Sequence, residues 1–230
     1  MDVTEIIAYP MKRDDWARTL LIGGVLVFFS FLLVPILLAY GYIVRTIRRT
    51  LSGDPQPPVF DAWGELLVDG LQAWAISLIY LLIPLLVAGV TVGGSIAAIA
   101  TGTESGAAAG VGGLMVGLGL TSILLLVFGY LSVAAVVNFA KEERFGAAFD
   151  FGRIKTVVLD RGYAIAWLVS VVILVIASFV TAIPLIGWLL SPFVGFYAAV
   201  VAANLWAGGF DRALDSTTVR GRTKSEETAL

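Results

Sequence analysis

Cysteine and histidine are both absent from the 230 residues of the chain. Without them the chain can form no disulfide, no thiolate nucleophile, no zinc–cysteine site and no histidine general base. Charged residues are scarce as well, at 14% against roughly 25% in soluble domains. The formal net charge of −2 is too small to indicate a nucleic-acid partner.

Apolar residues are abundant instead: they make up 59% of the chain, and the mean hydropathy is +0.93. They gather in uncharged runs at residues 19–44, 75–100, 111–140, 162–181 and 192–208. About 20 such residues in a helix cross the roughly 30 Å of hydrocarbon in a bilayer. A soluble fold of this length cannot enclose so many buried helices. The sequence therefore predicts an all-α, polytopic integral membrane bundle of about five to six apolar helices.

Residues 59–74, which we call the 59–74 segment, follow the turn residues Pro55, Pro57 and Pro58. Read as a helix, the segment has an apolar face and an acidic face. The apolar face carries Trp63, Leu66, Leu67, Leu71 and Trp74, the acidic face carries Glu65, Asp69 and Gln72, and Asp61 stands at the N-cap position. This pattern predicts an amphipathic helix in the cytoplasmic membrane interface.

The acidic face of this segment is unusual, because interfacial helices that bind anionic lipid carry Lys and Arg there. We therefore expect Glu65 and Asp69 to face protein. The arginines that end the preceding apolar run, Arg45, Arg48 and Arg49, are the expected partners.

The 59–74 segment is echoed later in the chain. Phe60-Asp61 followed by Leu67-Val68-Asp69 is similar to Phe149-Asp150 followed by Val158-Leu159-Asp160. Asn138 and Asn204 each stand nine residues after a glycine near the end of an apolar run. The echo is either an internal repeat, as in many membrane folds, or convergence of apolar sequence; we favour the repeat. Residues 1–210 are thus expected to form one transmembrane domain with a pseudo-repeat, and residues 211–230 a polar cytoplasmic tail that is partly disordered.

The distribution of positive charge predicts the orientation. Twelve of the fifteen Lys and Arg follow the first, third and fifth apolar runs, while the loops at residues 101–110 and 182–191 contain none. The 59–74 segment, its echo and the C-terminus are therefore expected in the cytoplasm. Residues 19–44 either cross once, which places the N-terminus outside, or bend near residues 30–35, which keeps it inside; we favour the bend.

Four stretches of the sequence carry a family resemblance: YPMKRDDW, PILLAYGYIVRTIRR, PPVFDAWGELLVDGLQAW and FGAAFDFGRI. They resemble the archaeal membrane family known as domain of unknown function 4013, over roughly residues 5–210. The resemblance implies an integral protein of an archaeal cell membrane. It implies no activity.

The polar and small residues near the apolar runs give the candidate sites. Asn138 and Asn204 either line a solute path or form hydrogen bonds between helix ends, and the second is favoured. Ala109, Gly113, Gly117 and Thr121 recur every four residues and predict a close helix contact. The carboxylates Asp61, Glu65, Asp69, Asp150 and Asp160 match no metal-ligand motif, so ion pairing and capping are favoured over a metal or catalytic site. No catalytic, cofactor-binding or metal residue is assigned, and no cofactor is expected.

The favoured function is a non-enzymatic scaffold or accessory subunit in the cell membrane. Its expected partners are the lipid bilayer and a protein partner or a second copy held through membrane helices. The alternative is a passive or facilitative carrier or channel for a small solute or lipid. A carrier needs a continuous polar cavity between its helices, which a scaffold does not.

Overall fold

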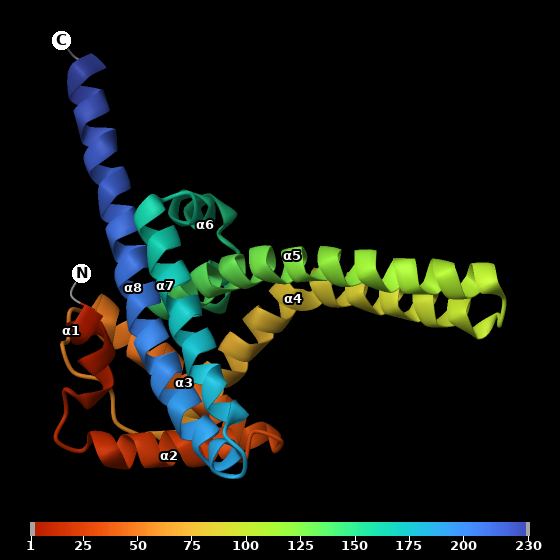
Figure 1. Cartoon of the computed structure of the whole chain (residues 1–230). Helices are drawn as coiled ribbons and strands as arrows, with labels where there is room; N and C mark the ends of the chain where they lie inside the picture. Colours follow the sequence, from red (N-terminus) through yellow and green to blue (C-terminus); the bar gives the residue numbers. More distant parts are fainter. Residues whose placement is uncertain (1–2, 229–230) are drawn as a thin grey trace. The chain divides into compact units, whose positions relative to one another are not determined.

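The structure, a computed structural model, describes residues 3–228 and, among them, the side chains of residues 4–216. Every regular element in this part of the chain is a helix, which confirms the predicted all-α class. In chain order the elements are α1 (Val3–Ala8), η1 (Tyr9–Met11), α2 (Trp16–Phe28), α3 (Leu33–Leu51), α4 (Trp63–Ala100), α5 (Glu104–Glu142), η2 (Phe145–Phe149), α6 (Phe151–Val158), α7 (Arg161–Ser178), η3 (Phe179–Ala182) and α8 (Ile186–Thr228) (Figure 1).

Four of the described helical segments are long and apolar enough to cross a membrane. They are Trp63–Ala100, Glu104–Glu142, Arg161–Ala182 and Ile186–Ser216. Helix α2 is apolar but shorter. The expected tail at residues 211–230 falls mostly on residues 217–230, whose side chains lie outside the described part of the structure.

The first apolar run is divided between two helices. Helix α2 ends at Phe28, Leu32 is extended, and α3 begins at Leu33. Pro35 falls in the first turn of α3, where a helix needs no backbone N–H donor, so the proline marks a helix start. The bend predicted near residues 30–35 is therefore present, and a single helix over residues 19–44 is wrong. The helix after the bend, α3, has 19 residues and extends beyond the apolar run to Leu51.

The 59–74 segment does not form a helix of its own, contrary to the sequence prediction. Helix α4 begins at Trp63 and continues without interruption to Ala100. Its start is set by Ala62, which has a φ of +45° and whose carbonyl accepts hydrogen bonds from the backbone N–H groups of Glu65 and Leu66. A positive φ cannot continue a right-handed helix toward Val59, so the helix begins at Trp63, one residue after the start that an N-cap at Asp61 implies.

The described chain divides into two compact units, of which unit 1 comprises residues 1–75 and 134–230. Helix α8 is central to it and contacts α7, α2 and α3; Figure 1 shows α7 alongside α8. Helix α2 approaches α8 through Gly23 and Gly24, whose missing side chains leave room for the rings of Phe196 and Phe193. Toward α7, the Trp206 Nε1–H donates to Ser170 Oγ at 2.6 Å.

One close helix crossing in unit 1 joins α3 to the first turns of α4. A Cβ at Gly41 would lie 1.9 Å from the carbonyl oxygen of Leu66, and a Cβ at Gly70 would lie 1.8 Å from that of Leu37. Only glycine permits this approach of two backbones. The face of α4 that meets α3 therefore contains Leu66, Gly70 and Ala73, all buried.

The two tryptophans of the 59–74 segment are not at the centre of this crossing. Trp63 is 47% exposed, and Trp74 is half-buried. Of the predicted apolar face, Leu66 is buried against α3, whereas the two tryptophans lie beside this contact and leave their exposed surface outside it. The face that packs is the one whose side chains are small enough to let α3 approach.

Unit 2 comprises residues 76–133, which form a hairpin of the later part of α4 and most of α5. The turn needs Gly102, whose φ of +68° lies in the left-handed region. The Thr103 hydroxyl then accepts a hydrogen bond at 3.0 Å from the backbone N–H of Gly106, which caps the start of α5.

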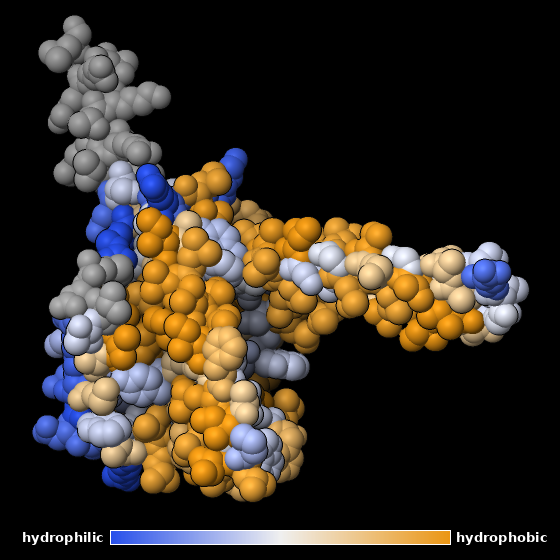
Figure 2. All heavy atoms as spheres, viewed as in Figure 1, coloured by the Kyte–Doolittle hydropathy of each residue, from blue (hydrophilic) through white to orange (hydrophobic). Residues whose placement is uncertain are grey.

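The two helices of unit 2 meet through small side chains, as the four-residue spacing predicted. A Cβ at Gly113 would lie 2.7 Å from Ser95 Oγ, and one at Gly117 would lie 2.5 Å from Thr91 Cβ. The predicted helix contact at Gly113 and Gly117 is therefore confirmed. The face of the hairpin visible in Figure 2 is mainly hydrophobic, and so is the visible face of α7 within unit 1.

Helix α8 begins earlier than predicted: the apolar run was expected to start at residue 192, whereas the helix starts at Ile186 and contains Pro192. The expected loop at residues 182–191 is limited to residues 183–185, between η3 and α8. A proline within a helix cannot donate to the carbonyl four residues earlier, here that of Trp188. The Ser191 hydroxyl donates to this carbonyl at 3.2 Å, so the oxygen freed by Pro192 is satisfied.

Candidate functional site

The arginines near the end of α3 each pair with a carboxylate of unit 1. Arg45 pairs with Asp61 and lies 3.7 Å from Glu65. Arg49 pairs with Asp54 in the loop after α3, at 2.7 Å. The predicted pairing of Glu65 with an upstream arginine is thus present, although both carboxylates facing Arg45 are largely exposed.

Arg48 makes the most enclosed of these pairs. Its guanidinium holds both carboxylate oxygens of Asp69, with Nη2–Oδ1 at 2.9 Å, and the Asp69 side chain is only 13% exposed. Arg48 Nε donates at 3.4 Å to the carbonyl of Ala140, and its Cζ lies 5.8 Å from the Phe139 ring centre. This arginine therefore joins α3 to the first turns of α4 and to the end of α5, and it confirms the expected partner of Asp69.

Asn138 is fully buried near the end of α5. Its Nδ2 donates to the carbonyl of Ala147 at 2.7 Å, and its Oδ1 accepts from Arg153 Nη1 at 3.2 Å. Arg153 also pairs with Glu142. Both ends of the amide are thus satisfied by protein, and Asn138 fastens η2 and α6 onto α5 rather than lining a solute path.

Asp150 and Asp160 cap helices. The Asp150 carboxylate accepts from the backbone N–H of Arg153 at 3.1 Å at the start of α6. The Asp160 carboxylate accepts from Gly162 and Tyr163 N–H at 2.7 and 3.1 Å at the start of α7. Capping, the favoured interpretation, is confirmed for both. Phe149, beside the first cap, packs with Phe145 at 5.7 Å between ring centres.

Asn204 forms the hydrogen bond between helices that the sequence predicted. Its Oδ1 accepts from the Thr50 hydroxyl at 3.1 Å and so joins α8 to α3. Sequence reasoning missed Thr50 as the partner. The spacing contained the signal, because Thr50 stands nine residues after Gly41, as Asn138 and Asn204 stand nine after Gly129 and Gly195.

An aromatic cluster next to these polar contacts was also missed. Tyr42 is fully buried, stacks on Phe60 with 4.4 Å between ring centres, and donates its hydroxyl proton to the Pro58 carbonyl at 2.9 Å. The ring centre of Phe196 lies 5.3 Å from that of Tyr42, and Trp63 stacks on Phe60 with 5.7 Å between ring centres. The prolines and aromatics around the start of the 59–74 segment therefore anchor the loop before α4 to the bundle.

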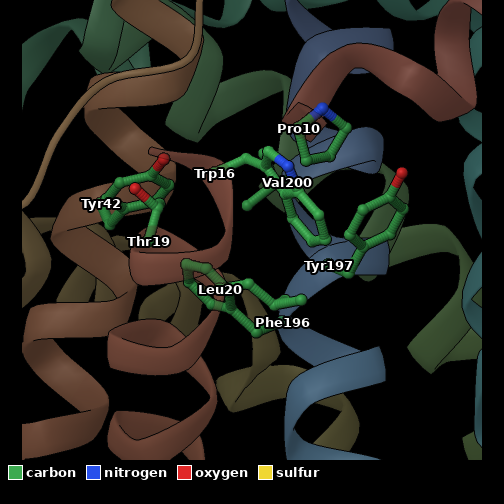
Figure 3. A pocket seen from close by; sticks show the side chains of 8 residues that line it. All are labelled: Pro10, Trp16, Thr19, Leu20, Tyr42, Phe196, Tyr197 and Val200. Carbon is green, nitrogen blue, oxygen red and sulfur yellow. The ribbon is translucent and has the colours of Figure 1, made fainter. Parts of the chain in front are cut away.

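A small apolar hollow adjoins the cluster (Figure 3). Trp16 and Leu20 of α2 line it together with Phe196 and Tyr197 of α8, and Pro10 lies at its edge. The Tyr197 hydroxyl donates to the Ile7 carbonyl at 2.5 Å, which ties α1 to α8. The hollow thus marks the place where the N-terminal segment is fastened to the bundle.

The chemistry available to this set of side chains is mainly structural. The carboxylates singled out by sequence, at positions 61, 65, 69, 150 and 160, are engaged in ion pairs or helix caps. Among the residues whose side chains are described, no three Asp or Glu side chains converge as a set of metal ligands. The arrangement holds helices together at one end of unit 1.

The comparison with protein families matches residues 25–186 to the model described as "Protein of unknown function (DUF4013)". The match covers more than half of the chain. The chain belongs to the DUF4013 family. No curated protein and no solved structure matches the chain.

The match to the DUF4013 family is shorter than the resemblance drawn from sequence, which extended over residues 5–210. It includes the glycine crossing, the Arg48–Asp69 pair and the Asn138 contacts. It leaves out Tyr9 and the YPMKRDDW segment at one end and Asn204 at the other. The features that hold α3, α4 and α5 together therefore lie in the DUF4013 region, and half of the Thr50–Asn204 contact lies beyond it.

Proposed function

We propose that this DUF4013 protein is a non-catalytic integral membrane protein that acts as a scaffold or accessory subunit. The observation that carries the proposal is the engagement of its conspicuous carboxylates by arginines and helix N-termini of the same chain. Carboxylates used in this way have no free proton-transfer or metal-binding role. The ion pairs and helix caps of unit 1, which we call the charged belt, then stabilise the chain itself. The surface that meets a partner lies on the apolar helices.

The hairpin of unit 2 is the proposed surface. Val90 on α4 and Val116 on α5 are each 74% exposed. Gly89, Gly93, Gly112 and Gly119 have no atom within 4 Å of where a Cβ would stand, leaving out their own helix backbone. Small residues on an exposed membrane helix allow another helix to approach closely. The proposed occupant is a transmembrane helix of a partner protein.

The hollow along the hairpin supports a scaffold over a carrier. It is lined mainly by valine, glycine, alanine and leucine, with Thr91 and Ser95 as its hydroxyl-bearing residues. The Thr91 hydroxyl donates back to the Val87 carbonyl of its own helix at 2.8 Å. Such a lining offers few groups to replace the hydration of a polar solute.

We also propose that the loops at residues 101–103 and 183–185 face outside and that the charged belt and both termini face the cytoplasm. The distribution of Lys and Arg supports this orientation. The division of residues 19–44 between α2 and α3 supports a cytoplasmic N-terminus, because the 13 residues of α2 extend only about 20 Å.

Photo-crosslinking tests the partner surface. A photoreactive amino acid placed at Val90 or at Val116 in the native membrane is expected to give a discrete protein adduct. The same residue at Val172 of α7, which is 55% exposed, is the matched control and is expected to give lipid adducts alone. An adduct of twice the 24.4 kDa chain mass identifies a second copy as the partner. Lipid adducts alone at all three positions would contradict the proposal.

A further inference from the structure

The bend between α2 and α3 lies beside the start of α8 in unit 1. The ring centres of Phe28, at the end of α2, and Trp188, in the first turn of α8, are 5.4 Å apart. The bend is therefore next to the loop at residues 183–185, which is proposed to face outside. We call the bend at residues 29–32 and this loop together the outer end of unit 1.

Helix α3 runs alongside α8 in the same direction, away from the outer end. The Thr50–Asn204 hydrogen bond and the Tyr42–Phe196 ring contact both join residues 154 positions apart, so the register of the two helices stays constant. Arg45 of α3 is thus level with a point thirteen residues after the start of α8, which is about 20 Å at 1.5 Å per residue. The charged residues of α3 begin at this distance from the outer end.

Helix α2 gives a distance no longer than that. Its only charged residue is Arg18, which stands ten residues before Phe28, about 15 Å along the helix. Four more charged residues come just before α2, at positions 12–15, and hydrophilic side chains gather where this helix begins (Figure 2). On the flank of unit 1 formed by α2 and α3, uncharged helix therefore extends only about 15–20 Å from the outer end.

The flank formed by α7 is much thicker. The segment Arg161–Ala182 has 22 residues, and after its first residue it contains no charge. It extends about 33 Å, which matches the roughly 30 Å of hydrocarbon in a bilayer. The charged start of α7 is level with a late part of α8, because the Ser216 hydroxyl donates to Asp160 Oδ2 at 3.3 Å. Two flanks of one bundle thus differ in the length of uncharged helix that they offer to lipid.

The exposure of the bend indicates the depth at which the short flank lies. Phe31 is 76% exposed, and each of residues 29–32 is exposed and lies outside α2 and α3. Irregular backbone that is exposed to lipid does not occur within the hydrocarbon region of a bilayer. The bend therefore belongs at the outer interface, as does the exposed Trp188 beside it.

A bilayer of ordinary thickness would then surround Arg18 and Arg45 with hydrocarbon. Arg18 is exposed, and Arg45 pairs with Asp61, whose side chain is largely exposed. Exposed charges are costly within the hydrocarbon region, whereas thinning of a bilayer carries only a modest cost for each ångström. The mismatch on this flank is therefore relieved more readily by the lipid than by burial of the charges.

We propose that unit 1 thins the bilayer along its α2–α3 flank to about 20 Å, so that headgroups and water of the cytoplasmic side reach Arg18 and Arg45. Along α7 the bilayer keeps its ordinary thickness. The partner of the α2–α3 flank is thus the lipid itself, held in a thin section beside the bundle. This rests on the proposed orientation, in which the loop at residues 183–185 faces outside and the charged belt faces the cytoplasm.

Single cysteines in the full chain, which has no native cysteine, test both ends of the short flank. Ser30→Cys in the bend is expected to react with a membrane-impermeant maleimide on intact cells. Ala17→Cys, in the first turn of α2, is expected to react in inverted membrane vesicles as fully as Thr4→Cys does. Ala17 is exposed and stands eleven residues before Phe28, about 16 Å along the helix, so a bilayer of ordinary thickness would bury it.

Val172→Cys on α7 is the matched control. Val172 is exposed, stands eleven residues before the loop that begins at residue 183, and is expected to stay unreactive from both sides. An Ala17→Cys protein as unreactive as Val172→Cys, or no reaction of Ser30→Cys from outside, would overturn the thinning. Thr103→Cys, labelled on intact cells, would still report the proposed orientation in that case. Reaction of Ala17→Cys on intact cells would contradict the orientation, and the thinning with it.

Discussion

Replacing Gly70 with alanine is expected to lower the melting temperature of the detergent-purified protein by roughly 6–12 °C, which corresponds to about 3 kcal/mol. The added Cβ would stand 1.8 Å from the Leu37 carbonyl oxygen, a backbone atom that no rotamer change can move. Helices α3 and α4 must therefore separate, and the buried contacts of Leu66 are lost with them. Gly41→Ala meets the Leu66 carbonyl in the same way and is expected to have the same effect.

Gly64→Ala is the matched control for this crossing. It adds the same methyl group to the same helix, but no atom lies within 4 Å of the new Cβ outside the neighbouring backbone. Its melting temperature is expected to stay at or slightly above that of the unchanged protein, because alanine favours helix. Thermal unfolding curves of the three variants decide the matter. Indistinguishable curves for Gly70→Ala and Gly64→Ala would mean that α3 and α4 do not cross at these glycines.

Arg48→Met is the second change with a large expected effect, a loss of about 2–3 kcal/mol. It leaves the Asp69 carboxylate, only 13% exposed, without its guanidinium, and methionine keeps the apolar stem that packs near Phe139. Arg45→Met, one turn earlier on the same helix, is expected to cost less than about 1 kcal/mol, because the side chains of Asp61 and Glu65 are 65% and 78% exposed.

The double variant Arg48→Met, Asp69→Leu separates the loss of the pair from the cost of an unpaired charge. Removing both partners is expected to restore more than half of the stability lost in Arg48→Met. Denaturant unfolding of the unchanged protein, Arg48→Met, Arg45→Met and the double variant, all in one detergent, measures these differences in stability. A double variant no more stable than Arg48→Met would show that Asp69 was never held by Arg48.

The contacts that the sequence predicted well are ion pairs, helix caps and close helix contacts through glycine. Asp69 had few cationic neighbours besides the α3 arginines, and Asp150 and Asp160 stood before helix-forming stretches. Gly113 and Gly117 stood in a four-residue series that requires a close neighbour. Each of these residues has a chemistry that restricts its partners, so the pattern alone was sufficient.

The buried face of the 59–74 segment could not be predicted in the same way. In a membrane protein the surface facing lipid is as apolar as the interior, so hydrophobicity does not separate the two. Leu66 belongs both to the predicted apolar face and to the packed face, but the packed face continues through Gly70 rather than through the tryptophans, because the approach of α3 decides it. The late start of α4 within this segment depends on Ala62, whose positive φ no propensity predicts.

Cysteine labelling tests most directly the proposal that the ion-paired residues of unit 1 and the loops at residues 101–103 and 183–185 face opposite sides of the membrane. The chain has no native cysteine, so single cysteines report cleanly. A cysteine replacing Thr103 is expected to react with a membrane-impermeant maleimide on intact cells, whereas a cysteine replacing Thr4 or Lys155 is expected to react only after permeabilisation. Equal labelling of all three positions on intact cells would contradict this arrangement, and labelling of Thr4 together with Thr103 alone would place the N-terminus outside.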